Sequence, residues 1–317
     1  MNWGFIGFGR IARKFLESLH SVEGELPYAF ASRSNAQDLK KEFPEVKIYD
    51  SYEGLLADPK VDVVYISTTH NFHYQNTLDA LEAGKHVLCE KPMSISSDQA
   101  EEMISLATKQ KLFFMEAMWM RFLPAYQSAI QRIKQGDIGE VRHLTASFGF
   151  RSEEKLTKDG RLMNPDLAGG ALYDVGVYPL NLASDIFGWE VTGFCAQARK
   201  SDTGVDESIQ IQMRFKEGQM AQLFGSVALH TNKEACIYGT EGYVRIPMFW
   251  KAQSYEVIKG DEIEAVDLPF QSNGYAHEIE EVVACIQRGK TSSTIYSLND
   301  SLMSAKLVEK ILSAIFN

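Results

Sequence analysis

The stretch Gly7-Phe8-Gly9-Arg10-Ile11-Ala12 decides the fold of this chain. An apolar segment, residues 2–6, precedes it, and apolar residues at helical spacing follow it. Strand, G-x-G-x-x-A, helix is the context in which a glycine-rich turn binds a dinucleotide. Gly7 permits the tight turn, Gly9 lets the backbone approach a pyrophosphate at the helix N-terminus, and Ala12 allows close helix–strand packing. We therefore predict that residues 7–12 contact a dinucleotide cofactor.

Downstream of this turn, short apolar segments alternate with amphipathic ones. Such alternation is typical of a parallel, doubly wound α/β sheet, which here indicates an N-terminal Rossmann domain, residues 1–122. The predicted strands are 28–31, 48–49, 61–67, 86–89 and 113–115, and the helices between them are 35–43, 51–56, 74–83 and 97–109.

The pattern changes near Pro124, where strands begin to dominate. Alternating apolar and polar residues, with turns at Glu217-Gly218 and Glu241-Gly242, predict a large, mostly antiparallel open sheet. We assign residues 123–317 to this C-terminal α+β domain and allow its last helix to pack back on the first domain. One predicted helix ends near residue 134, and two more span 275–288 and 299–316. The predicted strands are 141–150, 191–200, 208–215, 220–229, 235–238, 243–246, 254–258 and 263–268.

The residues that follow the predicted strand 28–31 bear on the choice of cofactor. An NAD-specific site usually has Asp or Glu there, to bind the ribose 2′-hydroxyl. This chain has Ser32-Arg33-Ser34, which offers a guanidinium and two hydroxyls to a 2′-phosphate. These residues favour NADP, with NAD as the alternative; a solvated arginine at a strand end is the other interpretation.

Polar side chains also follow two other predicted strands. Ser67, Thr68, Asn71 and His73 come after one strand, and Glu90-Lys91-Pro92 comes directly after the next. Carboxyl ends of parallel strands meet at one edge of the sheet, where ligands bind, so we assign these residues to the cofactor site. Pro92 biases Lys91 away from helix and holds it on a stiff turn. A solvated turn is the alternative interpretation of this tripeptide.

Composition limits the classes of function. The chain has 317 residues, a net charge of −10 and an apolar fraction of 45%, which are typical of a globular protein without a nucleic-acid footprint. Apolar runs are too short to span a membrane, and no secretory signal is evident. The four cysteines are far apart, which suits a reducing cytoplasm. The seven histidines have no metal-ligand spacing, so no metal site is expected.

Three longer motifs carry a resemblance to a known family. They are residues 7–12, residues 83–92 (Ala-Gly-Lys-His-Val-Leu-Cys-Glu-Lys-Pro) and residues 169–178 (Gly-Gly-Ala-Leu-Tyr-Asp-Val-Gly-Val-Tyr), and residues 278–282 with Gly289-Lys290 also fit. Together they resemble the Gfo/Idh/MocA family of NAD(P)-dependent oxidoreductases over nearly the whole chain. Residues 115–122 resemble the branch of dimeric dihydrodiol dehydrogenase and NADP-dependent D-xylose dehydrogenase.

This resemblance implies the roles of several residues. It implies that Lys91 and Tyr178 flank the carbon that exchanges hydride with the nicotinamide, and that Asp174 is a catalytic-site carboxylate. It also implies a homodimer built on the exposed face of the C-terminal sheet. Trp119 and Arg121 are assigned to the cofactor site, with plain packing and a structural ion pair, respectively, as alternatives.

The chemistry of these side chains agrees with the resemblance. Oxidation of a carbinol needs a base for the hydroxyl proton, and an ammonium such as Lys91 favours the phenolate of Tyr178. Asp174 and Tyr178 would share a helix face, but Pro179 should kink that helix, and some family members have histidine in place of Tyr178.

The expected substrate is a sugar, polyol or vicinal diol, bound in a pocket that residues 148–167 help to line. A catalytically silent NADP-binding regulator on the same fold is the alternative function; retention of both Lys91 and Tyr178 favours the enzyme.

Overall fold

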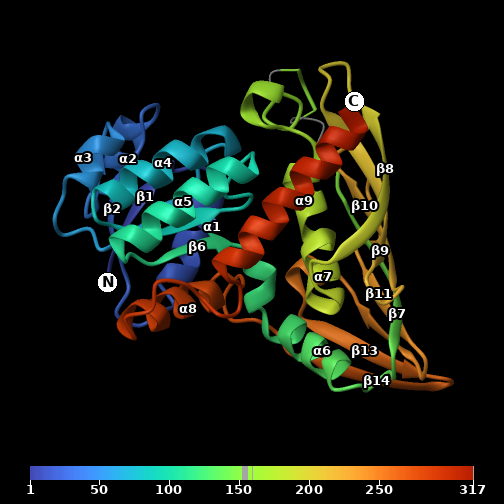
Figure 1. Cartoon of the computed structure of the whole chain (residues 1–317). Coiled ribbons are helices and arrows are strands. Elements are labelled where there is room, and N and C mark those ends of the chain that lie inside the picture. The colour runs from blue at the N-terminus through green and yellow to red at the C-terminus, as the bar shows by residue number, and fades with distance from the viewer. Residues whose placement is uncertain (152–155, 159, 317) are drawn as a thin grey trace. The chain divides into compact units, whose positions relative to one another are not determined.

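The computed structural model describes residues 1–151, 156–158 and 160–316 (Figure 1). The chain divides into two compact units: Met1–Trp119 with Gln271–Ala305, and Met120–Phe270 with Lys306–Asn317. The predicted boundary after residue 122 lies near the first division. The segment Gln271–Ala305, which the pattern places in the second domain, groups with the first unit.

The first unit contains a six-stranded parallel sheet in the order β3-β2-β1-β4-β5-β6. This order confirms the predicted doubly wound Rossmann fold, and it reverses between β1 and β4, where such sheets bind ligands. The strands are β1 (Asn2–Ile6), β2 (Leu26–Ala31), β3 (Lys47–Tyr49), β4 (Val63–Ile66), β5 (His86–Glu90) and β6 (Phe114–Ala117), and the helices are α1 (Arg10–Leu19), α2 (Ala36–Glu42), α3 (Tyr52–Leu56), α4 (His70–Glu82), α5 (Ser97–Gln110) and α8 (Ala276–Gln287).

Both faces of this sheet are buried, which explains the nearly continuous apolar strands. Ile66 and its neighbours pack against α4 and α5 in one hydrophobic cluster. Successive side chains point to opposite faces, so Tyr65 lies on the other side, where its ring stacks on Phe15 of α1 with centroids 3.8 Å apart. The predicted helix 74–83 begins earlier, at His70, because Thr69 has the extended backbone of a helix N-cap.

The second unit contains an eight-stranded sheet in the order β14-β13-β12-β11-β7-β10-β9-β8. Among the described strands of this sheet, only β7 and β10 pair in parallel, so the predicted mostly antiparallel sheet is confirmed. The strands are β7 (Val141–Gly149), β8 (Val191–Lys200), β9 (Asp206–Phe215), β10 (Met220–Ser226), β11 (Ala235–Gly239), β12 (Tyr243–Ile246), β13 (Ser254–Lys259) and β14 (Glu262–Asp267).

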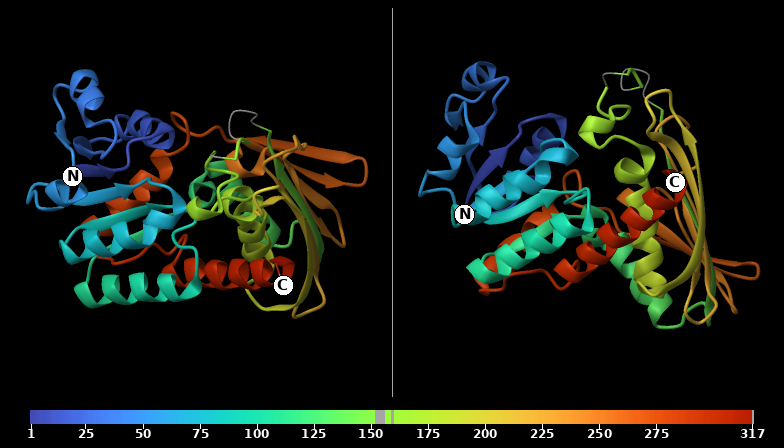
Figure 2. Two further views of the ribbon diagram at one scale, coloured as in Figure 1. Left: turned by 90° about the horizontal axis from the view of Figure 1, so that it is seen from above. Right: turned by 45° about the horizontal axis from the view of Figure 1, so that its top comes forward.

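Helices cover one face of this larger sheet. The π-helical turn η4 (Leu172–Gly176) and α7 (Val177–Phe187) contact β7 and β10, and α6 (Pro124–Lys134) contacts β12 and β13. In the part of the chain that the structure describes, the views of Figures 1 and 2 show no helix on the opposite face. Helix α9 (Leu298–Phe316) is divided between the two units after Ala305.

Candidate active site

The turn after β1 has the shape that the sequence predicts. Gly7 has φ = +81°, and a Cβ there would lie 2.8 Å from Thr68 Cγ2, so the position requires glycine. A Cβ at Gly9 would meet no atom within 4 Å, which leaves open space above the start of α1. Among the described residues, no side chain caps this helix and its first turn contains no acid. The free amides and the helix dipole therefore suit an anionic pyrophosphate.

The side chains of this turn divide between core and surface. The Phe8 ring is buried and stacks on Phe30 with centroids 4.1 Å apart, so only its backbone faces the turn. Ala12 is fully buried against the sheet, whereas Arg10 is exposed. The backbone of residues 7–12, rather than the Phe8 side chain, is what the turn offers a cofactor.

Arg33 lies on the surface at the end of β2, between two aromatic rings. Its guanidinium carbon is 4.5 Å from the ring centroid of Tyr52 in α3 and 5.6 Å from that of Phe72 in α4. These cation–π contacts hold the guanidinium in place without neutralising its charge. The neighbouring Ser32 is buried and its hydroxyl donates to Asn35 Oδ1, while Ser34 is exposed.

The residues after β4 link neighbouring strand ends to one another. The Ser67 hydroxyl donates to the Gly7 carbonyl at 2.6 Å, and Thr69 Oγ1 donates to Asn71 Oδ1 at 2.7 Å. His73 is fully buried, with Nδ1 2.8 Å from the Pro92 carbonyl oxygen and Nε2 3.1 Å from the Thr68 carbonyl oxygen. The His73 ring thus joins the segments that follow β4 and β5.

The turn that carries Lys91 is held by buried side chains on both sides. Tyr65 donates to Glu90 Oε1 at 2.6 Å, and the Lys91 amide donates to Glu90 Oε2 at 3.2 Å. The Lys91–Pro92 peptide bond is cis. Beyond it, the Met93 amide donates to Glu116 Oε1 at 3.1 Å. The backbone of Lys91 is therefore fixed at the carboxyl edge of the parallel sheet.

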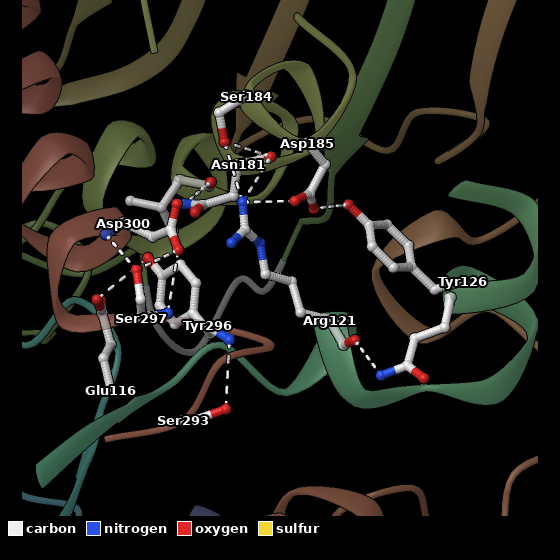
Figure 3. Close-up of polar contacts among 12 residues, drawn as sticks. Glu116, Arg121, Tyr126, Asn181, Ser184, Asp185, Ser293, Tyr296, Ser297 and Asp300 are labelled. Carbon is white, nitrogen blue, oxygen red and sulfur yellow. Dashed lines mark hydrogen bonds and ion pairs between the residues drawn. The ribbon is translucent and has the colours of Figure 1, made fainter. Parts of the chain in front are cut away.

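Glu116 is a buried acid that the sequence pattern does not mark as part of the site. Its second oxygen accepts from the Tyr296 hydroxyl at 3.2 Å (Figure 3). Burial raises the pKa of Glu116, whereas its hydrogen bonds and the charge of Lys91 act in the opposite direction. The sequence signals for Glu116 are its place near the end of a buried strand and within the segment 115–122 that carries the family resemblance, and neither singles it out.

Trp119 and Arg121, both assigned to the cofactor site, have different surroundings. The Trp119 ring stacks on Tyr275 with centroids 4.8 Å apart and an interplanar angle of 11°. Arg121 is 5% exposed and forms an ion pair with Asp185 at 2.7 Å (Figure 3). It also donates to Ser184 Oγ at 3.1 Å. These contacts favour the structural ion pair for Arg121, and its contact with a cofactor stays a prediction.

Asp174 and Tyr178 lie where a π-helical turn passes into an α-helix. The Val177 amide donates to the Leu172 carbonyl, five residues back, as in a π-helix, and α7 then begins. Pro179 falls in the first turn of α7, where its missing N–H is tolerated. The predicted irregularity at Pro179 is thus a change of helix type just before the proline.

Tyr178 lies beside an aromatic ring of the second unit. Tyr178 is 7% exposed, and its ring centroid lies 5.4 Å from that of Phe148 in β7. The Phe148 ring in turn contacts Trp250, with centroids 4.3 Å apart. An apolar wall of this kind can pack on the C–H face of a ring-shaped substrate.

Asp174 forms an ion pair with Arg161, whose Nη2 lies 2.8 Å from Asp174 Oδ1. Arg161 falls in the predicted pocket segment 148–167, but the sequence does not single it out, because that segment has neither periodicity nor a motif. Of the predicted pocket residues 148–167, positions 152–155 and 159 lie outside the described residues. Among the residues that the structure does describe, no cluster of potential ligands could hold a metal ion, and no helix could cross a membrane.

Two family models match the chain. Residues 1–118 match the N-terminal Gfo/Idh/MocA model, described as an oxidoreductase family with an NAD-binding Rossmann fold. Residues 126–245 match the Gfo/Idh/MocA C-terminal domain. The chain belongs to the Gfo/Idh/MocA family. It is an NAD(P)-dependent oxidoreductase, and the predicted family is confirmed.

Individual relatives support this assignment over the full length. A trans-1,2-dihydrobenzene-1,2-diol dehydrogenase from Xenopus laevis is 32% identical over 323 residues, 98% of this chain and 96% of the relative. A solved 3-ketoreductase from Actinomadura kijaniata, in complex with NADP and TDP-benzene, is 27% identical with a TM-score of 0.89, covering 99% and 98% of the two chains. An aldose-aldose oxidoreductase from Caulobacter crescentus, complexed with glycerol, is 25% identical with a TM-score of 0.88, covering 99% and 97%.

Proposed function

We propose that this Gfo/Idh/MocA protein is an NADP-preferring dehydrogenase or reductase that acts on a CH–OH group of a sugar, polyol or vicinal diol. One observation carries the proposal: Lys91 is fixed on a rigid turn at the carboxyl edge of the parallel sheet, and Tyr178 lies beside an aromatic wall. A silent cofactor-binding regulator would need neither group.

The fit of the cofactor rests on the turn after β1. The open space at Gly9 and the uncapped start of α1, both among the described residues, suit the pyrophosphate of NADP. NADP, when bound, supplies the hydride acceptor for oxidation or the hydride donor for reduction. In our proposal Tyr178 Oη removes the hydroxyl proton as the carbinol is oxidised, and the Lys91 ammonium stabilises the developing oxyanion. In reduction Tyr178 returns the proton to the same oxygen.

The preference for NADP rests on Arg33. Its guanidinium is fixed between Tyr52 and Phe72, and no acid stands at the end of β2, where the chain reads Ser32-Arg33-Ser34. A guanidinium pairs well with phosphate, and an acid there would repel it. The complex of the 3-ketoreductase with NADP is consistent with this choice.

The substrate class rests on the surroundings of Tyr178 and Asp174. Phe148 and Trp250 offer an apolar surface, and the Arg161–Asp174 pair of the same unit offers charged hydrogen-bonding groups. Sugars and arene dihydrodiols combine an apolar ring face with hydroxyl groups, so both match. The similarity to a trans-1,2-dihydrobenzene-1,2-diol dehydrogenase and to an aldose-aldose oxidoreductase supports the same substrate class.

We also propose that the uncovered face of the large sheet forms a homodimer. His143 of β7 pairs with Met220 of β10 on one side and with Tyr238 of β11 on the other, so these side chains form a row across the strands. Met220 is 54% exposed and Tyr238 37% exposed, which is costly for apolar side chains that stay in water. Light scattering at micromolar concentration tests the dimer; a monomer would contradict it. The predicted cytoplasmic location stays a prediction.

The proposed activity is tested by absorbance at the reduced-nicotinamide band. Purified protein is mixed with NADP or NAD and a panel of aldoses, polyols and trans-dihydrodiols, and the corresponding carbonyl compounds are tested with the reduced cofactors. We expect turnover with at least one class and a preference for NADP. Tight NADPH binding without turnover across the panel, in either direction, would favour the regulator instead.

A further inference from the structure

A buried carboxylate lies at the start of the helical element that carries Asp174 and Tyr178. Asp206, the first residue of β9, is 1% exposed, and its Oδ2 accepts a hydrogen bond from the Leu172 amide at 2.7 Å. Leu172 is the first residue of the π-helical turn η4. Asp206 is remote in sequence from this turn and belongs to no motif of the site.

The glycine pair before η4 is explained by this contact. Gly170 has φ = +115°, and a Cβ there would lie 2.2 Å from Asp206 Oδ1, so any side chain would push the carboxylate away. A Cβ at Gly169 would lie 2.6–2.9 Å from the carbonyl oxygens of the segment 161–164. Both glycines therefore serve close packing in the second unit.

The amides at the start of η4 partly offset the cost of burying a charged carboxylate at Asp206. The first turn of a helix leaves amides without intrahelical partners and carries the positive end of the helix dipole. A carboxylate there accepts charge-assisted hydrogen bonds, which are stronger than neutral ones. Because Asp206 is anchored in the sheet, it fixes the start of η4 relative to β9.

We propose that Asp206 is a positioning residue for the reaction: by anchoring the start of η4 it holds Asp174 and Tyr178 in the arrangement that turnover requires. This inference rests on the proposed function, since it assigns Asp206 a role in the site of that reaction. Asp206 acts through the helix and does not itself move the proton.

The cost of burying this group supports the proposal. Burial raises the pKa of Asp206 to about 7, although the amides of Ala171 and Leu172 and the backbone at Asp206 act in the opposite direction. Tyr173 lies near it, and burial together with the charges of Asp206 and Glu309 raises the pKa of Tyr173. An apolar side chain at this position would avoid the cost of burial, but it could not accept the hydrogen bond from the Leu172 amide.

The test compares Asp206→Asn with a matched control, Ser208→Ala. Asparagine keeps the size of the side chain but loses the charge and one acceptor. Ser208 is also buried on β9 and bonds to Ser226 Oγ at 2.7 Å, outside the proposed site. Three quantities are measured: hydrogen exchange in peptides covering residues 165–187, kcat and KM for the best substrate, and the Kd of NADPH.

For Asp206→Asn we expect faster exchange at the start of η4 and a fall in kcat of about tenfold, which is the loss expected when a charge-assisted hydrogen bond becomes a weaker one. KM and the Kd of NADPH should change less than about threefold, and Ser208→Ala should keep the wild-type kcat. Unchanged exchange, or faster exchange with a wild-type kcat, would overturn the proposal. If the wild-type protein shows no turnover, the proposed function fails, and the role assigned to Asp206 fails with it. Hydrogen exchange reports separately whether Asp206 anchors the start of η4. Asp206→Ala serves as a second variant where it folds.

Discussion

Arg161 Nη2 lies 2.8 Å from Asp174 Oδ1, so the carboxylate that the family resemblance places in the catalytic site is paired with a cation from an irregular segment. The pair joins the segment after β7 to the turn η4. Its side chains are 34% and 11% exposed, so their mutual attraction is only partly screened by water. Asp174 is thereby suited to orient its neighbours as a carboxylate rather than to donate a proton.

We predict that Arg161→Ala lowers kcat/KM by roughly tenfold, because Asp174 loses the partner that orients it. Arg161→Lys should recover only part of this loss, since an ammonium cannot reproduce the guanidinium fork. The free energy of unfolding should change by about 1 kcal/mol or less, as for other partly exposed pairs. Steady-state kinetics and urea unfolding check both expectations, and full activity in Arg161→Ala would exclude a role for the pair.

The cofactor preference gives a second prediction. A charge-assisted contact to the 2′-phosphate contributes roughly 1.5–3 kcal/mol, so wild type should prefer NADP over NAD by on the order of 10–100-fold. Arg33→Asp should abolish or invert that preference. Tyr52→Leu, which removes one of the rings that flank Arg33, should weaken NADP binding more than NAD binding. The measurement is a fluorescence titration with both reduced cofactors; equal affinities in wild type would contradict the assignment.

Asp206 gives a prediction about pH. Burial raises the pKa of Asp206 from its ordinary value of 3.8 to about 7. The folded protein therefore binds this proton more tightly than the unfolded chain does. Its contribution to the free energy of unfolding is complete below about pH 4 and is lost as pH rises through about 7. The stability of wild type relative to Asp206→Asn should fall by roughly 2–4 kcal/mol over this range, measured by urea unfolding. A constant difference would contradict the shift.

The two alternatives for Arg121 can be separated by changing its partner. Asp185→Ala removes the carboxylate that pairs with the buried Arg121 guanidinium, and breaking a buried pair typically costs about 3–5 kcal/mol of stability. Tyr126→Phe, which removes only the hydroxyl 2.6 Å from Asp185 Oδ2, should cost about 1 kcal/mol. If Arg121 is structural, the Kd of NADPH should change little in either variant. A large rise in that Kd with little loss of stability would favour the cofactor contact.

The sequence predicts most of the fold because the signals that decide it are local. The glycine turn of residues 7–12, the alternation of strands with helices, and the change of pattern near Pro124 each depend on neighbouring residues, and the two observed sheets agree with them. The start of a helix differed from the prediction where an N-cap residue sets it: α4 begins at His70, directly after Thr69. For the same reason, the rigid turn at Lys91 could be predicted from the proline beside it.

Contacts between distant segments could not be predicted in this way. Arg161 meets Asp174, and Asp206 meets Leu172, only because the second unit folds them together. Neither Arg161 nor Asp206 lies in a recognisable motif. The stacking of Phe8 on Phe30 shows the same limit, since the glycine motif does not reveal which way the intervening side chain points.

The central claim is that Lys91 and Tyr178 act in one step on the same substrate oxygen. The most direct measurement is steady-state kinetics with NADPH titration on Tyr178→Phe, Lys91→Ala and the double variant, with Ser208→Ala as the control. We predict that Tyr178→Phe lowers kcat by roughly 10²–10⁴-fold and Lys91→Ala by at least as much. The double variant should be little worse than the worse single one, with the Kd of NADPH nearly unchanged throughout. Near-normal turnover in Tyr178→Phe would contradict the account.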